Sequence, residues 1–209
     1  MRTAPAILGA LLIALSVGSG RSDAQPEGPA WRVETAPFRI VFLRHGLPLL
    51  SEAPGKPGAG TRLSYRLAET GAFHTVTSLR STRQTAQGFR YVVGTDEPGR
   101  TATVTILRTP HGVSVDFQPG PGAAVGTVFE AFRSNGKEHF LGTGERARVD
   151  LRRTEVPLKV WAECASSKPA PFFLSPRGYG VLIGSNAIGR LGFPYAKGDA
   201  HCELGTEPC

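Results

Sequence analysis

The chain has 209 residues, a formal net charge of +7, and 26 glycines and 17 prolines. A length of roughly 100 to 200 residues usually corresponds to one domain, so two full domains are excluded. The glycines and prolines are neither periodic nor concentrated in one stretch, which excludes a collagen-like or low-complexity chain and indicates many turns.

The basic residues are dispersed along the chain. Arginine supplies 19 of the 24 basic residues, and no basic run is longer than Arg152-Arg153. A surface that binds nucleic acid needs clustered positive charge together with aromatic platforms. We therefore expect no nucleic-acid partner and interpret the arginines as parts of a solvated face.

Residues 1–24 have the pattern of a signal peptide. Arg2 precedes a mostly apolar run from Ala4 to Val17, which is shorter than the roughly 20 apolar residues that a membrane-spanning helix needs. Ala24 and Ser22 are small residues at alternate positions, so we expect cleavage after Ala24. The alternative is an uncleaved anchor. The sequence thus predicts a secreted or periplasmic domain at 25–209, without a membrane contact after cleavage.

The chain has three cysteines, Cys164, Cys202 and Cys209, and five histidines. Export to an oxidising compartment would allow one disulfide and leave one cysteine unpaired, and the pairing stays open. There is no C-x-x-C or H-x-x-x-H spacing, and the histidines are far apart in the sequence. We therefore expect no metal site and no cofactor.

A β-hairpin is the clearest structural pattern, and it runs from Thr101 to Gln118 with its turn at Thr109 to Gly112. Apolar and polar residues alternate along both arms, as in a half-buried antiparallel pair. The positions expected to face inward are Ala102, Val104, Ile106, Val113, Val115 and Phe117.

Further short strands are expected along the rest of the chain. Their segments are 38–43, 62–67, 73–79, 89–93, 125–132, 158–162 and 179–183. The last of these is apolar on both faces, which is typical of a central strand. The proline- and glycine-rich segment from Leu47 to Gly60 is expected to be a long loop. No amphipathic helix is evident, so the pattern predicts an all-β fold, an antiparallel β-sandwich or barrel.

The segment 142–146 reads G-T-G-E-R. Its two glycines permit a backbone path that is closed to residues with a Cβ atom, and a carboxylate and a guanidinium follow directly. Such a loop could present Glu145 and Arg146 to sugar hydroxyls as planar acceptors and donors. The alternative interpretation is a β-bulge with a surface ion pair.

Three segments together resemble the N-terminal β-sandwich of family 31 glycoside hydrolases, the α-glucosidase and α-xylosidase family. They are G-T-G-E-R at 142–146, V-W-A-E at 160–163, and P-F-F-L-S-P-R-G-Y-G-V at 171–181, which G-S-N-A at 184–187 extends. Their order and spacing agree with the family's pattern, and the strong part covers about a quarter of the chain.

This resemblance implies a galactose-mutarotase-like β-sandwich that packs on a catalytic barrel and lends a loop to the rim of its sugar pocket. It implies Glu145, Arg146 and Glu163 as candidate substrate-binding residues, and a structural role for Arg177 and Tyr179 in setting their strand against the barrel. The sequence departs from the family at 150–153, where D-L-R-R lacks a glycine, and at Glu163, where the family has an aspartate.

The catalytic carboxylates of this family belong to the barrel and, for a retaining mechanism, lie about 5 Å apart. We therefore expect no catalytic residue in this chain. The predicted function is that of a non-catalytic domain of a secreted enzyme, truncated before its barrel, with α-glucosides or α-xylosides as partners through the missing domain. Two alternatives remain: an exported carbohydrate-binding module, which would need exposed aromatic platforms, and a scaffold without a ligand.

Overall fold

The computed structural model describes residues 9–13, 30–54, 62–134, 137–144, 151, 154–158, 169–185, 187–193 and 199–205. For 9–13, 154–158, 169, 188 and 199–205 it describes the backbone alone. The regular secondary structure in the described residues is all β-strand, which confirms the predicted all-β class. Among these residues there is no helix that is long and apolar enough to cross a membrane.

Sixteen strands are present in the described residues. Their bounds are β1 Gly9–Ile13, β2 Trp31–Thr35, β3 Phe38–Arg44, β4 Leu47–Ser51, β5 Ser64–Leu67, β6 Phe73–Thr85, β7 Gly88–Thr95, β8 Thr101–Thr109, β9 Gly112–Pro119, β10 Val125–Arg133, β11 Leu141–Gly144, β12 Thr154–Leu158, β13 Pro169–Ser175, β14 Tyr179–Gly184, β15 Ile188–Phe193 and β16 Asp199–Gly205.

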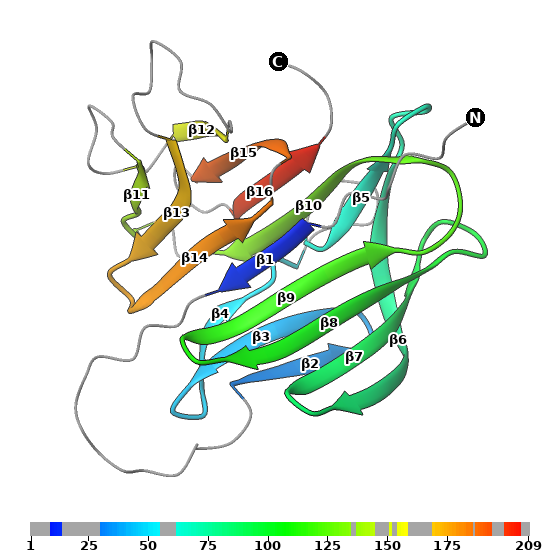
Figure 1. Cartoon of the computed structure of the whole chain (residues 1–209), viewed down its shortest axis with the longest axis horizontal. Coiled ribbons are helices and arrows are strands. Elements are labelled where there is room, and N and C mark those ends of the chain that lie inside the picture. The colour runs from blue at the N-terminus through cyan, green and yellow to red at the C-terminus, as the bar shows by residue number, and fades with distance from the viewer. Residues whose placement is uncertain are drawn as a thin grey trace.

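The strands form two antiparallel sheets (Figure 1). The large sheet has thirteen strands in the order β11-β13-β14-β1-β9-β8-β7-β6-β5-β10-β16-β15-β12, and the small sheet has the order β2-β3-β4. Strand β6 turns the corner of the large sheet, because residues 73–75 pair with β5 while residues 76–85 pair with β7. Two register shifts in β6 are consistent with this bend, since β-bulges bend the strand that carries them.

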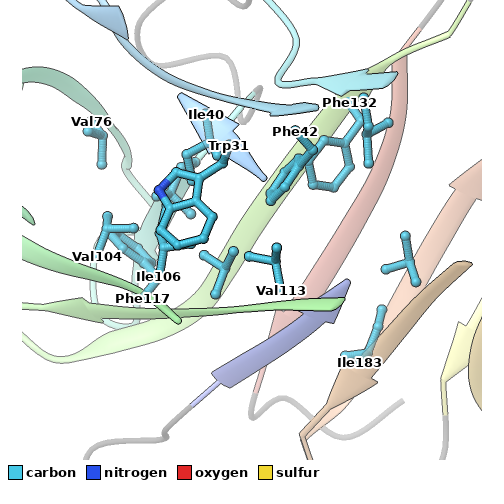
Figure 2. Packing of buried hydrophobic residues seen from close by; sticks show 14 of the residues in the cluster. Trp31, Ile40, Phe42, Val76, Val104, Ile106, Val113, Phe117, Phe132 and Ile183 are labelled. Atoms are coloured by element: carbon cyan, nitrogen blue, oxygen red, sulfur yellow. The ribbon is translucent and has the colours of Figure 1, made fainter. Parts of the chain in front are cut away.

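The small sheet covers the face of strands β7, β8 and β9, and the main core lies between them (Figure 2). Trp31 on β2 donates a hydrogen bond from Nε1 to the hydroxyl oxygen of Tyr91 on β7 at 3.1 Å. Phe42 on β3 packs edge-on against Phe132 on β10, with ring centroids 6.2 Å apart. The small sheet therefore contacts the large sheet on both sides of its bend at β6, through β7 and through β10.

A second aromatic cluster joins the two ends of the large sheet. Phe140, Phe173 on β13 and Phe193 on β15 have ring centroids 4.9 to 5.8 Å apart, and all three are almost fully buried. Strands β13 and β15 belong to opposite ends of the sheet order. The ends of the large sheet therefore pack face to face, which gives the two-layered arrangement of a β-sandwich.

The predicted hairpin is confirmed as β8 and β9. Its six inward positions are all buried, with exposed fractions of 3% or less, and Val104 lies opposite Phe117 as the alternation requires. Tyr179–Ile183 is confirmed as an internal strand, because β14 lies between β13 and β1. The expected strand at 158–162 corresponds to β12 only at Leu158, and residues 159–162 lie outside the described residues.

The prediction that Leu47 to Gly60 forms a loop is wrong for its first five residues. Leu47–Ser51 is β4, an edge strand of the small sheet that pairs with β3. Leu49 and Leu50 are buried there, and this burial outweighs the turn preference of the flanking residues. Pro48 is tolerated because it lies on an edge strand next to a register shift.

The structure bears on two further expectations. Strand β1 lies within the predicted signal peptide, and its backbone pairs with both β9 and β14. Cys202 lies on β16, whereas Cys164 and Cys209 lie outside the described residues, so the disulfide pairing stays open.

Candidate functional site

The three predicted substrate-binding residues, Glu145, Arg146 and Glu163, lie outside the described residues. The two glycines that precede them are described. Gly142 has a φ of 121°, and a Cβ atom there would lie 2.7 Å from the carbonyl oxygen of Phe172 on β13. The backbone of β11 therefore approaches β13 as closely as a glycine allows, which agrees with the interpretation of G-T-G as a close backbone path.

The motif at 171–181 forms the tight hairpin between β13 and β14. Ser175 and Tyr179 face each other across the two strands, and Gly178 closes the turn with a φ of 87° and a hydrogen bond from its backbone N–H to the carbonyl oxygen of Ser175. Because cross-strand neighbours point to the same face of a sheet, the Ser175 and Tyr179 side chains lie together.

Both side chains converge on Glu138, which lies between β10 and β11 and is 5% exposed. Its Oε1 accepts hydrogen bonds from Ser175 Oγ and from the Tyr179 hydroxyl, each at 2.5 Å. Arg177 Nη1 lies 3.3 Å from its Oε2 and forms an ion pair with it. A buried carboxylate with these three partners is well satisfied, so this group, here called the Glu138 network, stabilises the hairpin.

The environment keeps Tyr179 in its neutral form. Burial is the main cause of its raised pKa, and the hydrogen bond to the Glu138 carboxylate acts in the same direction because it requires a protonated phenol. Tyr179 is therefore a hydrogen-bond donor in the physiological pH range. It cannot supply a phenolate for chemistry there.

Arg177 also connects the hairpin to the small sheet. Its Nη2 donates a hydrogen bond to the carbonyl oxygen of Leu49 on β4 at 2.5 Å, and its guanidinium lies 6.0 Å from the centre of the Tyr179 ring. The sequence analysis expected Arg177 and Tyr179 to be structural, through contact with a barrel. In the structure their contacts lie within the domain and hold the β13–β14 turn against β4.

A surface pocket of about 380 Å³ opens beside this network. Its lining comes from β4, from the end of β10 and from the hairpin turn, and consists of Pro48, Leu49, Ser51, Arg133, Ser134 and Arg177. Two guanidinium groups and two hydroxyl groups could bind carboxylate or sugar oxygens, and the volume is within the usual range for small ligands. We call this the Arg133–Arg177 pocket.

Two carboxyl groups lie together elsewhere, in the interior where β4 meets β10. Glu52 is 1% exposed and Glu130 is 6% exposed. Burial is the main reason that the pKa of Glu52 is raised to about 7, and burial together with the neighbouring Glu52 raises that of Glu130 well above its usual value. The Ile40 backbone N–H donates to Glu52 Oε2 at 2.9 Å. Both carboxyl groups are almost fully enclosed by protein, so neither is accessible to a substrate.

None of Glu52, Glu130 and Glu138 was singled out in the sequence analysis. A signal for Glu130 was present, because it shares the period-two face of its strand with Val128 and Phe132, where a charged residue is unexpected. Ser175 and Tyr179 flank the turn Pro-Arg-Gly symmetrically, which places them opposite each other. Nothing in the sequence places Glu138 or Glu52 near these partners, because both contacts are long-range.

The described residues show neither a metal-binding cluster nor an aromatic platform on the surface. No group of three His, Cys, Asp or Glu side chains among them is arranged to hold a metal ion. The large hydrophobic side chains that are exposed in this part of the chain are Leu47 and Leu174, both aliphatic. Trp31 is buried in the core, and Trp161 lies outside the described residues.

No protein-family model and no curated protein matches the chain. Among solved structures, it is similar to the GH31 dextranase of Flavobacterium johnsoniae, both as a mutant complexed with isomaltotriose and as a complex with glucose. The sequence identities are 15% and 14%, and the TM-score is 0.34 in both comparisons. Each covers 84% of this chain and 24% of the dextranase chain, so this chain spans about a quarter of the dextranase's length.

Proposed function

We propose that this chain is the non-catalytic N-terminal β-sandwich of an exported family 31 glycoside hydrolase that acts on α-linked sugars. Its task is to support a catalytic domain and to lend the loop with Glu145 and Arg146 to the rim of that domain's sugar pocket. Glu163 contributes an additional acceptor for a sugar hydroxyl. The carboxylates that cleave the glycosidic bond belong to the catalytic domain.

The observation that carries this proposal is the position in the fold of the segments that resemble family 31. The G-T-G run and the S-P-R-G-Y hairpin lie on β11, β13 and β14, which are adjacent strands at one end of the large sheet. Segments that are about 30 residues apart in the sequence thereby meet at one end of the sheet. Glu145 and Arg146 follow directly in the sequence after Gly144, the last residue of the edge strand β11.

The arrangement of the carboxyl groups also favours a supporting role. A retaining glycosidase needs two carboxyl groups on opposite sides of the scissile bond, about 5 Å apart. Glu52 and Glu130 contact each other inside the protein, and Glu138 is occupied by Ser175, Arg177 and Tyr179. These three buried acids therefore have structural partners in place of a substrate.

The direct test is an assay of the purified chain with aryl α-glucosides and aryl α-xylosides. We expect no turnover by the chain alone, and we expect it to raise the soluble yield or the activity of a family 31 catalytic barrel that lacks its own N-terminal domain. An unrelated β-sandwich of similar size is the control for nonspecific solubilisation. Turnover that co-purifies with the chain would contradict the proposal.

Titration with isomaltotriose separates a supporting domain from a stand-alone carbohydrate-binding module. We expect no saturable binding by the chain alone, because the described surface lacks an aromatic platform and the predicted loop forms only part of a pocket. Saturable binding in the absence of a catalytic domain would instead favour the module. Arg133→Ala is the matched variant, because it changes the Arg133–Arg177 pocket without touching the Glu138 network.

A further inference from the structure

The described groups of the Arg133–Arg177 pocket carry an excess of positive charge. Both charged residues in its described lining are arginines, and no acidic side chain is among them. The counterion of Arg177 is Glu138, a buried carboxylate whose other oxygen accepts hydrogen bonds from Ser175 and Tyr179. This ion pair balances one of the two arginines and leaves the other. The pocket therefore favours an anionic ligand.

Arg177 is held in position before any ligand binds. Its Nη1 contacts Glu138 Oε2 at 3.3 Å and its Nη2 donates to the carbonyl oxygen of Leu49 at 2.5 Å. These contacts use two of the five N–H donors of a guanidinium, and the Arg177 side chain is still 37% exposed. A side chain that is already ordered loses little conformational freedom on binding. Arg177 can therefore donate to a ligand in a fixed direction.

The uncharged part of the lining narrows the class of anion. Ser51 and Ser134 bring hydroxyl groups, and Pro48 and Leu49 bring apolar surface. A bare phosphate or sulfate would use the arginines and leave the apolar wall without a partner. A uronic acid has a carboxylate, ring hydroxyls and apolar C–H faces, so one such sugar matches all three kinds of lining group. The volume of about 380 Å³ is within the usual range for small ligands.

We propose that the Arg133–Arg177 pocket binds a sugar that carries a carboxylate, a uronate residue. The carboxylate lies on the two guanidinium groups, and the ring hydroxyls bind Ser51 and Ser134. The proposal is independent of the proposed function, because this chain alone forms the pocket. A neutral sugar such as isomaltotriose lacks the carboxylate and is not expected to bind there.

The test is a titration of the full 209-residue chain with glucuronate, glucose and acetate at constant ionic strength, followed by backbone amide chemical shifts. We expect saturable shifts with glucuronate at residues 49–51, 133–134 and 177. Glucose lacks the charge and acetate lacks the ring, so each should bind at least about tenfold more weakly than glucuronate.

Three variants separate the groups that bind from a general effect of charge. Arg133→Ala should weaken glucuronate binding at least about tenfold, and Arg133→Lys should restore only part of it because lysine lacks the planar pair of donors. Ser51→Ala should weaken glucuronate binding and leave that of acetate unchanged. Arg83→Ala is the matched control, because Arg83 is exposed on β6, does not line the pocket and carries the same charge.

Four outcomes would overturn the proposal. Acetate that binds as tightly as glucuronate would indicate a simple anion site, and glucose that does so would show that the carboxylate is not recognised. Equal losses in Arg133→Ala and Arg83→Ala would indicate nonspecific attraction to a basic protein. Absence of saturation, in variants and parent chain that keep the same Tm, would show that the pocket does not bind this class of ligand.

Discussion

Glu52 and Glu130 share a hydrogen bond in the interior of the protein, at the place where the small sheet meets the large one. Burial raises the pKa of both carboxyl groups, and the neighbouring Glu52 raises that of Glu130 further, so the pair keeps a proton at pH values where an exposed glutamate loses it. Backbone hydrogen bonding joins the two sheets at the same point. Glu52 forms a β-bridge with Phe132, and the Ala53 N–H donates to the carbonyl oxygen of Ala131. The protonation of this pair therefore affects the junction of the two sheets.

The first prediction concerns pH. A carboxyl group whose pKa is raised by folding stabilises the protein at low pH and loses that contribution as pH rises through the folded value. Glu52, whose pKa moves from 4.5 to about 7, should contribute a decrease of on the order of 3 kcal/mol in the free energy of unfolding between these pH values, and Glu130, whose pKa is also raised, should add to this decrease. The measurement is urea unfolding at several pH values.

Glu130→Gln is the matched variant for the pH prediction. The amide can still donate to the Glu52 carboxylate but does not titrate, so the decrease in stability above pH 4.5 should become shallower. Desolvation opposes the ionisation of Glu97, but hydrogen bonds from Tyr65 and Arg100 outweigh it and lower the pKa of Glu97. Glu97 therefore titrates at lower pH and does not interfere with this measurement. An unchanged pH profile in Glu130→Gln would show that the pair does not control the junction.

The second prediction concerns the Glu138 network. Tyr179→Phe removes one of the donors to a buried carboxylate, and we expect a loss of about 1–3 kcal/mol in the free energy of unfolding. In a Glu138→Gln background the same substitution should cost less, because a neutral amide needs the donor less than a carboxylate does. A double-mutant cycle by urea unfolding measures this coupling. Strict additivity of the two substitutions would argue against the network.

The third prediction compares two glycines with positive φ. Gly142 (φ 121°) and Gly71 (φ 68°) both adopt a backbone conformation that costs other residues about 1 kcal/mol. A Cβ atom at Gly142 would also lie 2.7 Å from the backbone carbonyl oxygen of Phe172, whereas nothing lies within 4 Å of one at Gly71. Gly142→Ala should therefore lower the Tm more than Gly71→Ala. Equal losses would show that β11 can move away from β13 without a further cost.

The fourth prediction compares two neighbouring residues on β13. Phe173 is 6% exposed and packs between Phe140 and Phe193, whereas Leu174 is 41% exposed. Phe173→Ala should cost about 3–5 kcal/mol, because it leaves a cavity where the two ends of the large sheet meet. Leu174→Ala should cost about 0.5 kcal/mol or less. Similar losses in chemical denaturation would mean that the cluster does not join the two ends.

Local patterns in the sequence predicted those strands whose alternation is complete within a few residues. The β8–β9 hairpin is the clearest case, because its inward positions and its turn are neighbours in the chain. Strand β4 was missed because the prolines and glycines near Leu47–Ser51 indicate a loop, and only pairing with β3 and burial of Leu49 and Leu50 make it a strand. The site residues Glu145, Arg146 and Glu163 remain predictions.

Alternation of apolar and polar residues along the chain was sufficient to determine the all-β class and the inward face of the central hairpin, because a strand's period of two is a local property. Tertiary structure alone decided which acids are buried together, how Glu138 meets Ser175 and Tyr179, and that the Gly9–Ile13 backbone lies between β9 and β14. These contacts join residues that are far apart in the sequence. They depend on the order of the strands in the sheet, which no local pattern encodes.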